Sequence, residues 1–207
     1  MKWWLAAILV YCFQLGFSQE TEQINTVFKQ YQQAVIHKNG NKAFQLVNKQ
    51  TINFYKEVWK ASNSADSATV CSYSFEEKLW ILTTRHLISK QEAAQLNEQF
   101  LFEYLMRNGW IHKEDISKLT IGETDIQENY AIAQMQLNGE DIPYFFQFEK
   151  ENGKWKVNLI EMLEAAGRNV EAVIQAGSLS ENSFIIESIE KISGKKANRA
   201  IWLPFKS

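Results

Sequence analysis

Three histidines and a set of carboxylates are the side chains of this chain that could carry out acid–base chemistry. A histidine and a carboxylate that face one pocket can abstract and return a proton when burial tunes both pKa values. The candidates are His112, His86, Asp125 and Asp141. No spacing in the sequence places any two of them together, so the chain favours a protein that is not an enzyme.

Structural roles also account for two of the three histidines. His37 follows the first expected helix, where an imidazolium complements the negative C-terminal end of the helix dipole. His86 lies in register with Leu79 and Leu82, which predicts a half-buried, hydrogen-bonded packing residue. No second histidine stands within a helical turn of another, and the phosphate-loop, dinucleotide and Gly-x-Ser-x-Gly motifs are absent. We therefore expect no metal site and no cofactor.

Aromatic side chains make up 13 % of the chain and offer a second kind of site. Six of them fall on elements that we expect to surround an interior: Tyr31, Tyr55, Trp59, Tyr144, Phe146 and Trp155. One interpretation is a packed core. The other is a pocket in which tyrosine hydroxyls orient a small apolar ligand, and for this pocket the candidate ligand-binding residues are Tyr31, Tyr55, Trp59, Tyr144 and Phe146.

Residues 1–18 have the order of a cleaved signal peptide. One cation, Lys2, precedes an uncharged apolar run, and Gly16 to Ser18 supply small residues before the polar Gln19. The apolar run is shorter than the roughly 20 residues that span a bilayer. We expect a periplasmic or secreted protein that is not inserted in a membrane after cleavage. The mature chain then keeps one cysteine, Cys71, which excludes an internal disulfide.

The charge balance argues against nucleic acid as a partner. The chain has 22 Lys and Arg against 24 Asp and Glu, a net charge of −2, and these charges are interspersed without a basic run of five or more. Binding to phosphates requires a basic face. Oligomer formation is left open by the sequence.

Hydrophobic spacing predicts helices first and a sheet later. Apolar residues recur every three or four positions from Ile24 onward, and Asn39 with Gly40 predicts a left-handed cap. Residues 62–69 are small and polar and predict a surface loop. Two capping-box motifs, Ser74 with Glu77 and Ser89 with Glu92, predict helices over about 75–88 and 90–107.

Past residue 116 the apolar period changes from about four to two. Alternating segments near 119–126, 130–137, 144–148 and 155–159 are joined in part by Asn138-Gly139 and Asn152-Gly153, which favour tight hairpin turns. Helical spacing returns after Glu161, and a last helix is predicted over about 181–193. We expect an α+β fold: N-terminal helices packed on a curved four-stranded antiparallel sheet, extra helices inserted before the sheet, and a helical C-terminal tail.

The central hairpin, residues 146–157, reads Phe-Gln-Phe-Glu-Lys-Glu-Asn-Gly-Lys-Trp-Lys-Val. This segment, after N-terminal helices, resembles the nuclear transport factor 2-like superfamily, the cystatin-like cone fold. The closing segment from Phe184 to Pro204 resembles the end of exported bacterial proteins with this domain. The resemblance covers roughly residues 22–60 and 118–160, and it implies a cone with an interior pocket. The length of the mature chain predicts one domain over 19–207. This domain departs from the minimal family pattern by a helical insertion at 62–117 and a helical extension at 161–207.

That resemblance does not select a function, because the fold serves several. The leading hypothesis is a non-enzymatic exported module that binds a small apolar ligand or a protein partner. The first alternative is a small-molecule isomerase, dehydratase or hydrolase that uses a histidine and a carboxylate. The second alternative is an inhibitor or immunity protein that acts outside the cytoplasm.

The signal-peptide interpretation predicts that the exported protein begins at or near Gln19, because signal peptidase cleaves after the small residues. Intact-mass measurement of exported material checks this. A mass that still includes residues 1–18 would contradict it.

Overall fold

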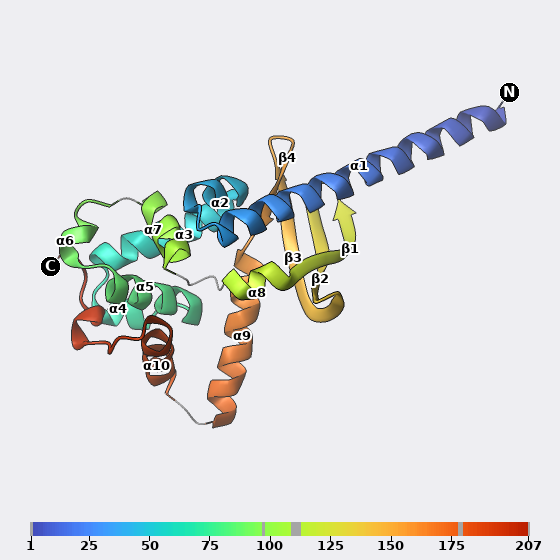
Figure 1. The fold of residues 1–207 in the computed structure, drawn as a ribbon. Coiled ribbons are helices and arrows are strands. Elements are labelled where there is room, and N and C mark those ends of the chain that lie inside the picture. Colours follow the sequence, from blue (N-terminus) through green and yellow to red (C-terminus); the bar gives the residue numbers. More distant parts are fainter. Residues whose placement is uncertain (1, 97, 109–112, 178–179, 207) are drawn as a thin grey trace. The chain divides into compact units, whose positions relative to one another are not determined.

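The computed structural model describes residues 2–96, 98–108, 113–177 and 180–206 (Figure 1). Within these residues the chain forms ten α-helices, a short 3-10 helix and one four-stranded antiparallel sheet, with helices on both sides of the sheet in the sequence. The predicted α+β fold is therefore confirmed. The chain divides into two compact units, the first made of residues 1–48 and 111–159 and the second of residues 49–110 and 160–207. The helices predicted as an insertion and an extension lie mainly in the second unit.

The first unit carries the sheet. Its elements are α1 (Lys2–Ile36), α2 (Gly40–Leu46), α8 (Lys113–Lys118), β1 (Leu119–Gln127), β2 (Tyr130–Leu137), β3 (Glu140–Glu151) and β4 (Lys154–Asn158). The strands follow the order β1-β2-β3-β4, each antiparallel to the next, which is the predicted meander. β3 starts earlier and ends later than the segment that alternation indicated.

The two Asn-Gly pairs form the predicted turns. Asn138 and Gly139 have φ values of 55° and 85°, and Asn152 and Gly153 have φ values of 49° and 74°. Positive φ at both central residues matches the right-handed twist of the flanking strands, which is why Asn-Gly is favoured there. The turn at Asn152 pairs Glu151 with Lys154 and so sets the register of β3 against β4.

One face of the sheet packs against α1, which crosses it in Figure 1. Phe28 on α1 and Phe146 on β3 lie 4.8 Å apart between ring centroids. The buried side chains of this core alternate along the strands and recur every three or four residues along the helix: Ile24, Val27, Phe28, Tyr31, Val35, Ala131, Ala133, Phe146, Phe148, Trp155 and Val157. Phe148 and Trp155 are therefore core residues of the sheet.

The end of α1 differs from the expected glycine cap. The left-handed residue is Lys38, with φ of 55°, and Asn39 has a negative φ. Asn39 instead caps the start of α2, where its side-chain oxygen accepts a hydrogen bond from the backbone N–H of Lys42 at 3.1 Å. Asparagine serves both kinds of position, so the sequence did not separate them.

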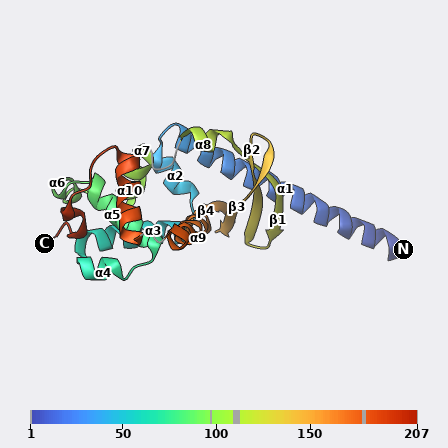
Figure 2. The same cartoon turned by 90° about the horizontal axis from the view of Figure 1, so that it is seen from below.

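The second unit is helical. Its elements are α3 (Lys49–Ser64), α4 (Ser67–Cys71), α5 (Phe75–Leu87), α6 (Lys90–Ala93), α7 (Glu98–Arg107), α9 (Ile160–Gly177), α10 (Glu181–Ser193) and the 3-10 helix η1 (Arg199–Trp202). α5 and α10 lie side by side in Figures 1 and 2. Both capping boxes are present, at Ser74 and at Ser89.

The helix predicted over 90–107 is interrupted. α6 ends at Ala93, after which the N–H groups of Gln95 and Leu96 bond to the carbonyls of Glu92 and Ala93, three residues back. Such tight turns end an α-helix, and α7 begins afterwards at Glu98.

The segment 62–69 is not the surface loop that its polar composition predicted. α3 continues to Ser64, α4 begins at Ser67, and Ser62, Asn63 and Ala65 are buried. The buried Ser62 hydroxyl and Asn63 amide satisfy themselves by donating to carbonyls four residues back, at 2.8 Å each. Small side chains leave the backbone of this helix end accessible to another group.

That group is the guanidinium of Arg85 on α5, which is buried without a carboxylate partner among the described residues. It donates to the carbonyls of Ala61 at 2.9 Å, Ala65 at 2.5 Å and Ser62 at 3.0 Å. Burial lowers the pKa of Arg85 to about 10. The carbonyls at the C-terminal end of α3, which carry the negative end of the helix dipole, compensate the charge.

The C-terminal segment packs on the same helix end. The N–H groups of Phe205 and Lys206 donate to the carbonyls of Ser62 at 3.2 Å and Asn63 at 3.1 Å, and the Phe205 ring lies 6.2 Å from Trp59. Ile201 is buried, and its carbonyl accepts from Arg85 at 3.4 Å. The apolar run 201–205 therefore packs against α3 and α5 of its own unit.

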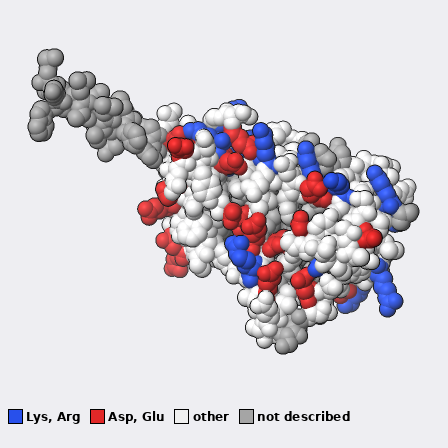
Figure 3. All heavy atoms as spheres, turned by 180° about the vertical axis from the view of Figure 1, so that it is seen from behind, with Lys and Arg blue, Asp and Glu red and all other residues white. Residues whose placement is uncertain are grey.

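Acidic and basic side chains are interspersed over the face drawn in Figure 3. Among the described residues, no helix combines the length and the apolar character needed to cross a bilayer.

The register of β3 places Phe148 and Phe145 on opposite faces of the sheet, so their substitution should lower stability by very different amounts. Phe148→Ala should lower the free energy of unfolding by about 3 to 5 kcal/mol, because its side chain is fully buried. Phe145→Ala, on the opposite face and 51 % exposed, should change it by less than about 0.5 kcal/mol. Denaturant unfolding measures both. Equal losses would contradict the register.

Candidate ligand-binding site

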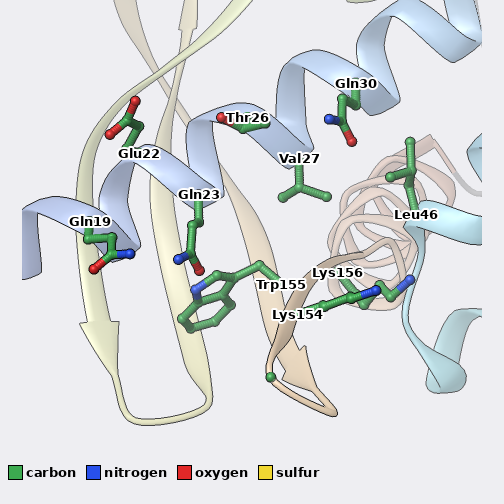
Figure 4. A pocket seen from close by; sticks show the side chains of 11 residues that line it. Gln19, Glu22, Gln23, Thr26, Val27, Gln30, Leu46, Lys154, Trp155 and Lys156 are labelled. Atoms are coloured by element: carbon green, nitrogen blue, oxygen red, sulfur yellow. The ribbon is translucent and has the colours of Figure 1, made fainter. Parts of the chain in front are cut away.

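A pocket of about 520 Å³ lies within the first unit, between α1 and β4 (Figure 4). One wall is a face of α1 and the other is the start of β4, with Leu46 of α2 at one side. The lining residues are Gln19, Glu22, Gln23, Thr26, Val27, Gln30, Leu46, Gly153, Lys154, Trp155 and Lys156. The volume falls within the range of sites for small ligands.

The helix wall is polar because of its spacing. Its residues recur at i, i+3, i+4, i+7, i+8 and i+11 from Gln19, the spacing of one helical face, which lies beside the apolar face that meets the sheet. Within the described part of the chain, six side chains of this pocket make no hydrogen bond or ion pair: Gln19, Glu22, Gln23, Thr26, Gln30 and Lys154. They offer three amides, a hydroxyl, a carboxylate and an ammonium to a ligand.

Trp155 adds a buried donor to the pocket. Its side chain is in the core, with the residue 4 % exposed, and its indole Nε1–H has no acceptor among the described residues. In Figure 4, Gln23 points toward this indole while Lys154 and Lys156 point away from it. A buried N–H without an acceptor costs about 1 to 3 kcal/mol, so a ligand that supplies an acceptor would recover stability.

The face of the Trp155 ring is covered by the side chain of Lys150. The Lys150 ammonium lies 5.4 Å from the ring centroid and also pairs with the Glu20 carboxylate. This cation–π contact holds the ring in place. The ring face is therefore engaged within the protein.

The strand wall of the pocket is the edge of β4. Successive side chains of a strand point to opposite faces, so four consecutive residues can line one pocket only along the strand edge. Gly153 of the turn and the next three residues, Lys154 to Lys156 of β4, line the pocket in this way. The pocket therefore runs along the edge of β4.

The register identifies which backbone groups these are. Glu151 pairs with Lys154 across the two-residue turn, so Lys150 and Trp155 form the next, non-hydrogen-bonded pair. Lys150 accordingly donates its N–H to Asn129, on the other side of β3, at 2.7 Å. The N–H and C=O of Trp155 must point away from β3, and within the described residues they have no partner.

The charges of the pocket are of both signs. Glu22 lies on the helix wall and Lys154 on the strand wall, and neither is in an ion pair among the described residues. Lys156 is engaged, since its ammonium donates to the carbonyl of Gln45. A ligand that is neutral, or that carries one charge of each sign, suits this arrangement.

The five aromatic candidates occupy other places. Tyr31 and Phe146 are buried in the core of the first unit, and Tyr55 and Trp59 are buried in the second. Tyr55 meets Trp80 and Phe102 edge to face, and burial raises the pKa of its phenol. Tyr144 is 42 % exposed. None of the five lines this pocket, whereas the sixth aromatic residue, Trp155, does.

The acid–base candidates are dispersed. His86 is half-buried in the second unit, where its Nε2 lies 2.9 Å from the Ser193 hydroxyl, and the packing role predicted for it is confirmed. Asp125 is exposed on β1 in the first unit and accepts a hydrogen bond from Gln127. Asp141 accepts from Gln136 on β2, and His112 lies outside the described residues.

The remaining histidine is at the end of α1. His37 is exposed, and its Nδ1 lies 2.8 Å from the carbonyl of Gln33 in the last turn, as expected for a residue that complements a helix C-terminus. In the described ranges, no three His, Cys, Asp or Glu side chains are grouped so as to hold a metal ion.

Sequence reasoning missed the glutamine face of α1. The signal was present, because positions 19, 22, 23, 26 and 30 repeat every three or four residues. A polar helical face is ordinarily solvated, and its partner strand lies more than 100 residues further along the chain. The sequence gives no sign of that juxtaposition.

A scan against protein-family models, a search of curated proteins and a search of solved structures each found no match to this chain.

The environment of His86 predicts a loss of stability in acid. Burial lowers the pKa of His86, and Lys195 lowers it further against the opposing effect of Glu190. The folded state therefore binds this proton less tightly than the unfolded state, so stability is complete above the ordinary pKa of about 6.5 and declines as the pH falls below it.

Between about pH 7.5 and pH 5.5, the His86→Gln variant should lose less unfolding free energy than the unmodified protein. Denaturant unfolding at both pH values measures this, with His37→Gln as the exposed control. Identical pH dependence of the His86→Gln variant and the unmodified protein would refute the assignment.

Proposed function

We propose that this protein is an exported, non-enzymatic binding module of the nuclear transport factor 2-like type, and that it holds a small ligand in the pocket between α1 and β4. The observation that carries the proposal is the buried, unpaired indole N–H of Trp155 at a pocket of about 520 Å³. The other polar side chains of the pocket that lack a partner among the described residues are exposed. Folded proteins pair their buried polar groups, and the unpaired Trp155 indole N–H is the exception in this site.

The packing of the first unit supports a binding site at this position. Phe28, Tyr31 and Phe146 are buried between α1 and the sheet, where the cone fold would otherwise offer an interior pocket. A filled interior favours binding at another surface over chemistry inside the cone. The absence of a described histidine from the lining residues supports a non-enzymatic role as well.

Export is compatible with this site. Cleavage after Ser18 would leave every lining residue in the mature protein, because the first of them is Gln19. The mature protein would then act in the periplasm or outside the cell.

A binding screen tests the proposal. The protein is titrated with separate pools of free amino acids, short peptides, disaccharides and small carboxylates, and the indole signal of Trp155 is followed by NMR. At least one pool should shift this signal, because each supplies hydrogen-bond acceptors. Trp155→Phe assigns the signal.

Gln23→Ala should weaken the response about two- to tenfold, as expected for the loss of one neutral hydrogen bond from an exposed amide. Gln33→Ala, on an exposed part of the same helix outside the pocket, is the matched control and should leave the response unchanged. No response to any pool, or equal responses in both variants, would refute the proposed function.

A further inference from the structure

We propose that the ligand is a short peptide in extended conformation, which pairs its backbone with the open edge of β4 at Trp155. This inference rests on the proposed function and adds the chemical class of the ligand. Addition of a strand to a sheet edge is a common mode of peptide recognition.

The edge of β4 already carries one such pairing. Val47 forms a parallel bridge with Val157, and the N–H of Asn48 donates to the carbonyl of Val157 at 2.9 Å. Backbone groups of alternate residues point to the same edge, so the next position along this edge is Trp155. The residues before Val47 form the helix α2, so they cannot extend the parallel pairing with β4 as far as Trp155. The pocket begins at this position.

The pocket wall across from this edge suits peptide groups. Gln19, Gln23 and Gln30 each present a carbonyl acceptor and an amide donor, the same pair of groups that a peptide unit presents. A peptide that lies between α1 and β4 can therefore pair with Trp155 on one side and with glutamines on the other. Glu22 and Lys154 add one charge of each sign for its ends or side chains.

A saccharide fits the pocket less well. Sugars also use amide partners, and they stack on an open aromatic face. Trp155 has no open face, since its residue is 4 % exposed and the Lys150 ammonium lies over the ring. The ring therefore offers no stacking surface to a sugar.

The length of the open edge limits the peptide to a few residues. β4 has five residues, Val157 is already paired, and the turn begins at Gly153. One residue of the ligand can form the pair of backbone hydrogen bonds with Trp155, and its neighbours reach the glutamines at about 3.3 Å per residue.

The test compares three probes on the full mature chain. The first is a pool of tetrapeptides with acetylated and amidated ends, the second is the same pool methylated at every backbone nitrogen, and the third is a pool of disaccharides. The backbone amide and indole signals of Trp155 are followed by NMR. Capped ends ensure that binding reports the peptide backbone and not terminal charges.

We expect the capped tetrapeptides to shift both Trp155 signals and the methylated pool to bind about tenfold more weakly, because methylation removes the donors that pair with β4. Gln23→Ala should weaken tetrapeptide binding, and Gln33→Ala should not.

Equal binding of both peptide pools would overturn pairing at the β4 edge. A shift of the Trp155 signals by disaccharides and not by tetrapeptides would overturn the peptide inference while the proposed function stands. No shift with any of the three pools would overturn the inference, and the wider screen with amino acids and carboxylates then decides the function separately.

Discussion

The register of β4 against β3 is the constraint on which both the core and the site of the first unit depend. The turn at Asn152 and Gly153 pairs Glu151 with Lys154, and positive φ at both turn residues makes this two-residue connection favourable. The same register sends the Trp155 side chain into the core and turns its backbone groups toward the edge. A slip of one residue would expose Trp155 and direct those backbone groups to β3.

Each unit also buries polar groups, which costs free energy unless they are hydrogen-bonded. The two units differ in whether these groups find partners. In the second unit, Arg85 is matched by the carbonyls of the α3 terminus, and the C-terminal segment completes the network. Such a buried charge is tolerated because its donors are satisfied. In the first unit, the buried Trp155 indole N–H has no acceptor among the described residues, and the exposed glutamines of α1 line the same pocket. Under the proposed function, this unpaired donor is the reason to expect the ligand in the first unit.

Local signals predicted the elements better than the site. The capping boxes at Ser74 and Ser89 and the Asn-Gly turns depend on a few neighbouring residues, and all of them are present. The segment 62–69 was wrongly predicted as a surface loop, because its burial comes from Arg85, which is about 20 residues away in the sequence. The pocket required a helix face and a strand edge separated by more than 100 residues, and no local pattern joins them.

Amide hydrogen exchange at Trp155 in the ligand-free protein tests the account most directly. Lys156 is the internal reference, because its backbone groups pair with Glu149 on β3. The account predicts that the Trp155 amide exchanges faster than the Lys156 amide, and that capped tetrapeptides slow the exchange of Trp155 selectively. A Trp155 amide as protected as that of Lys156 in the ligand-free protein would contradict an open edge of β4 and with it the proposed mode of binding.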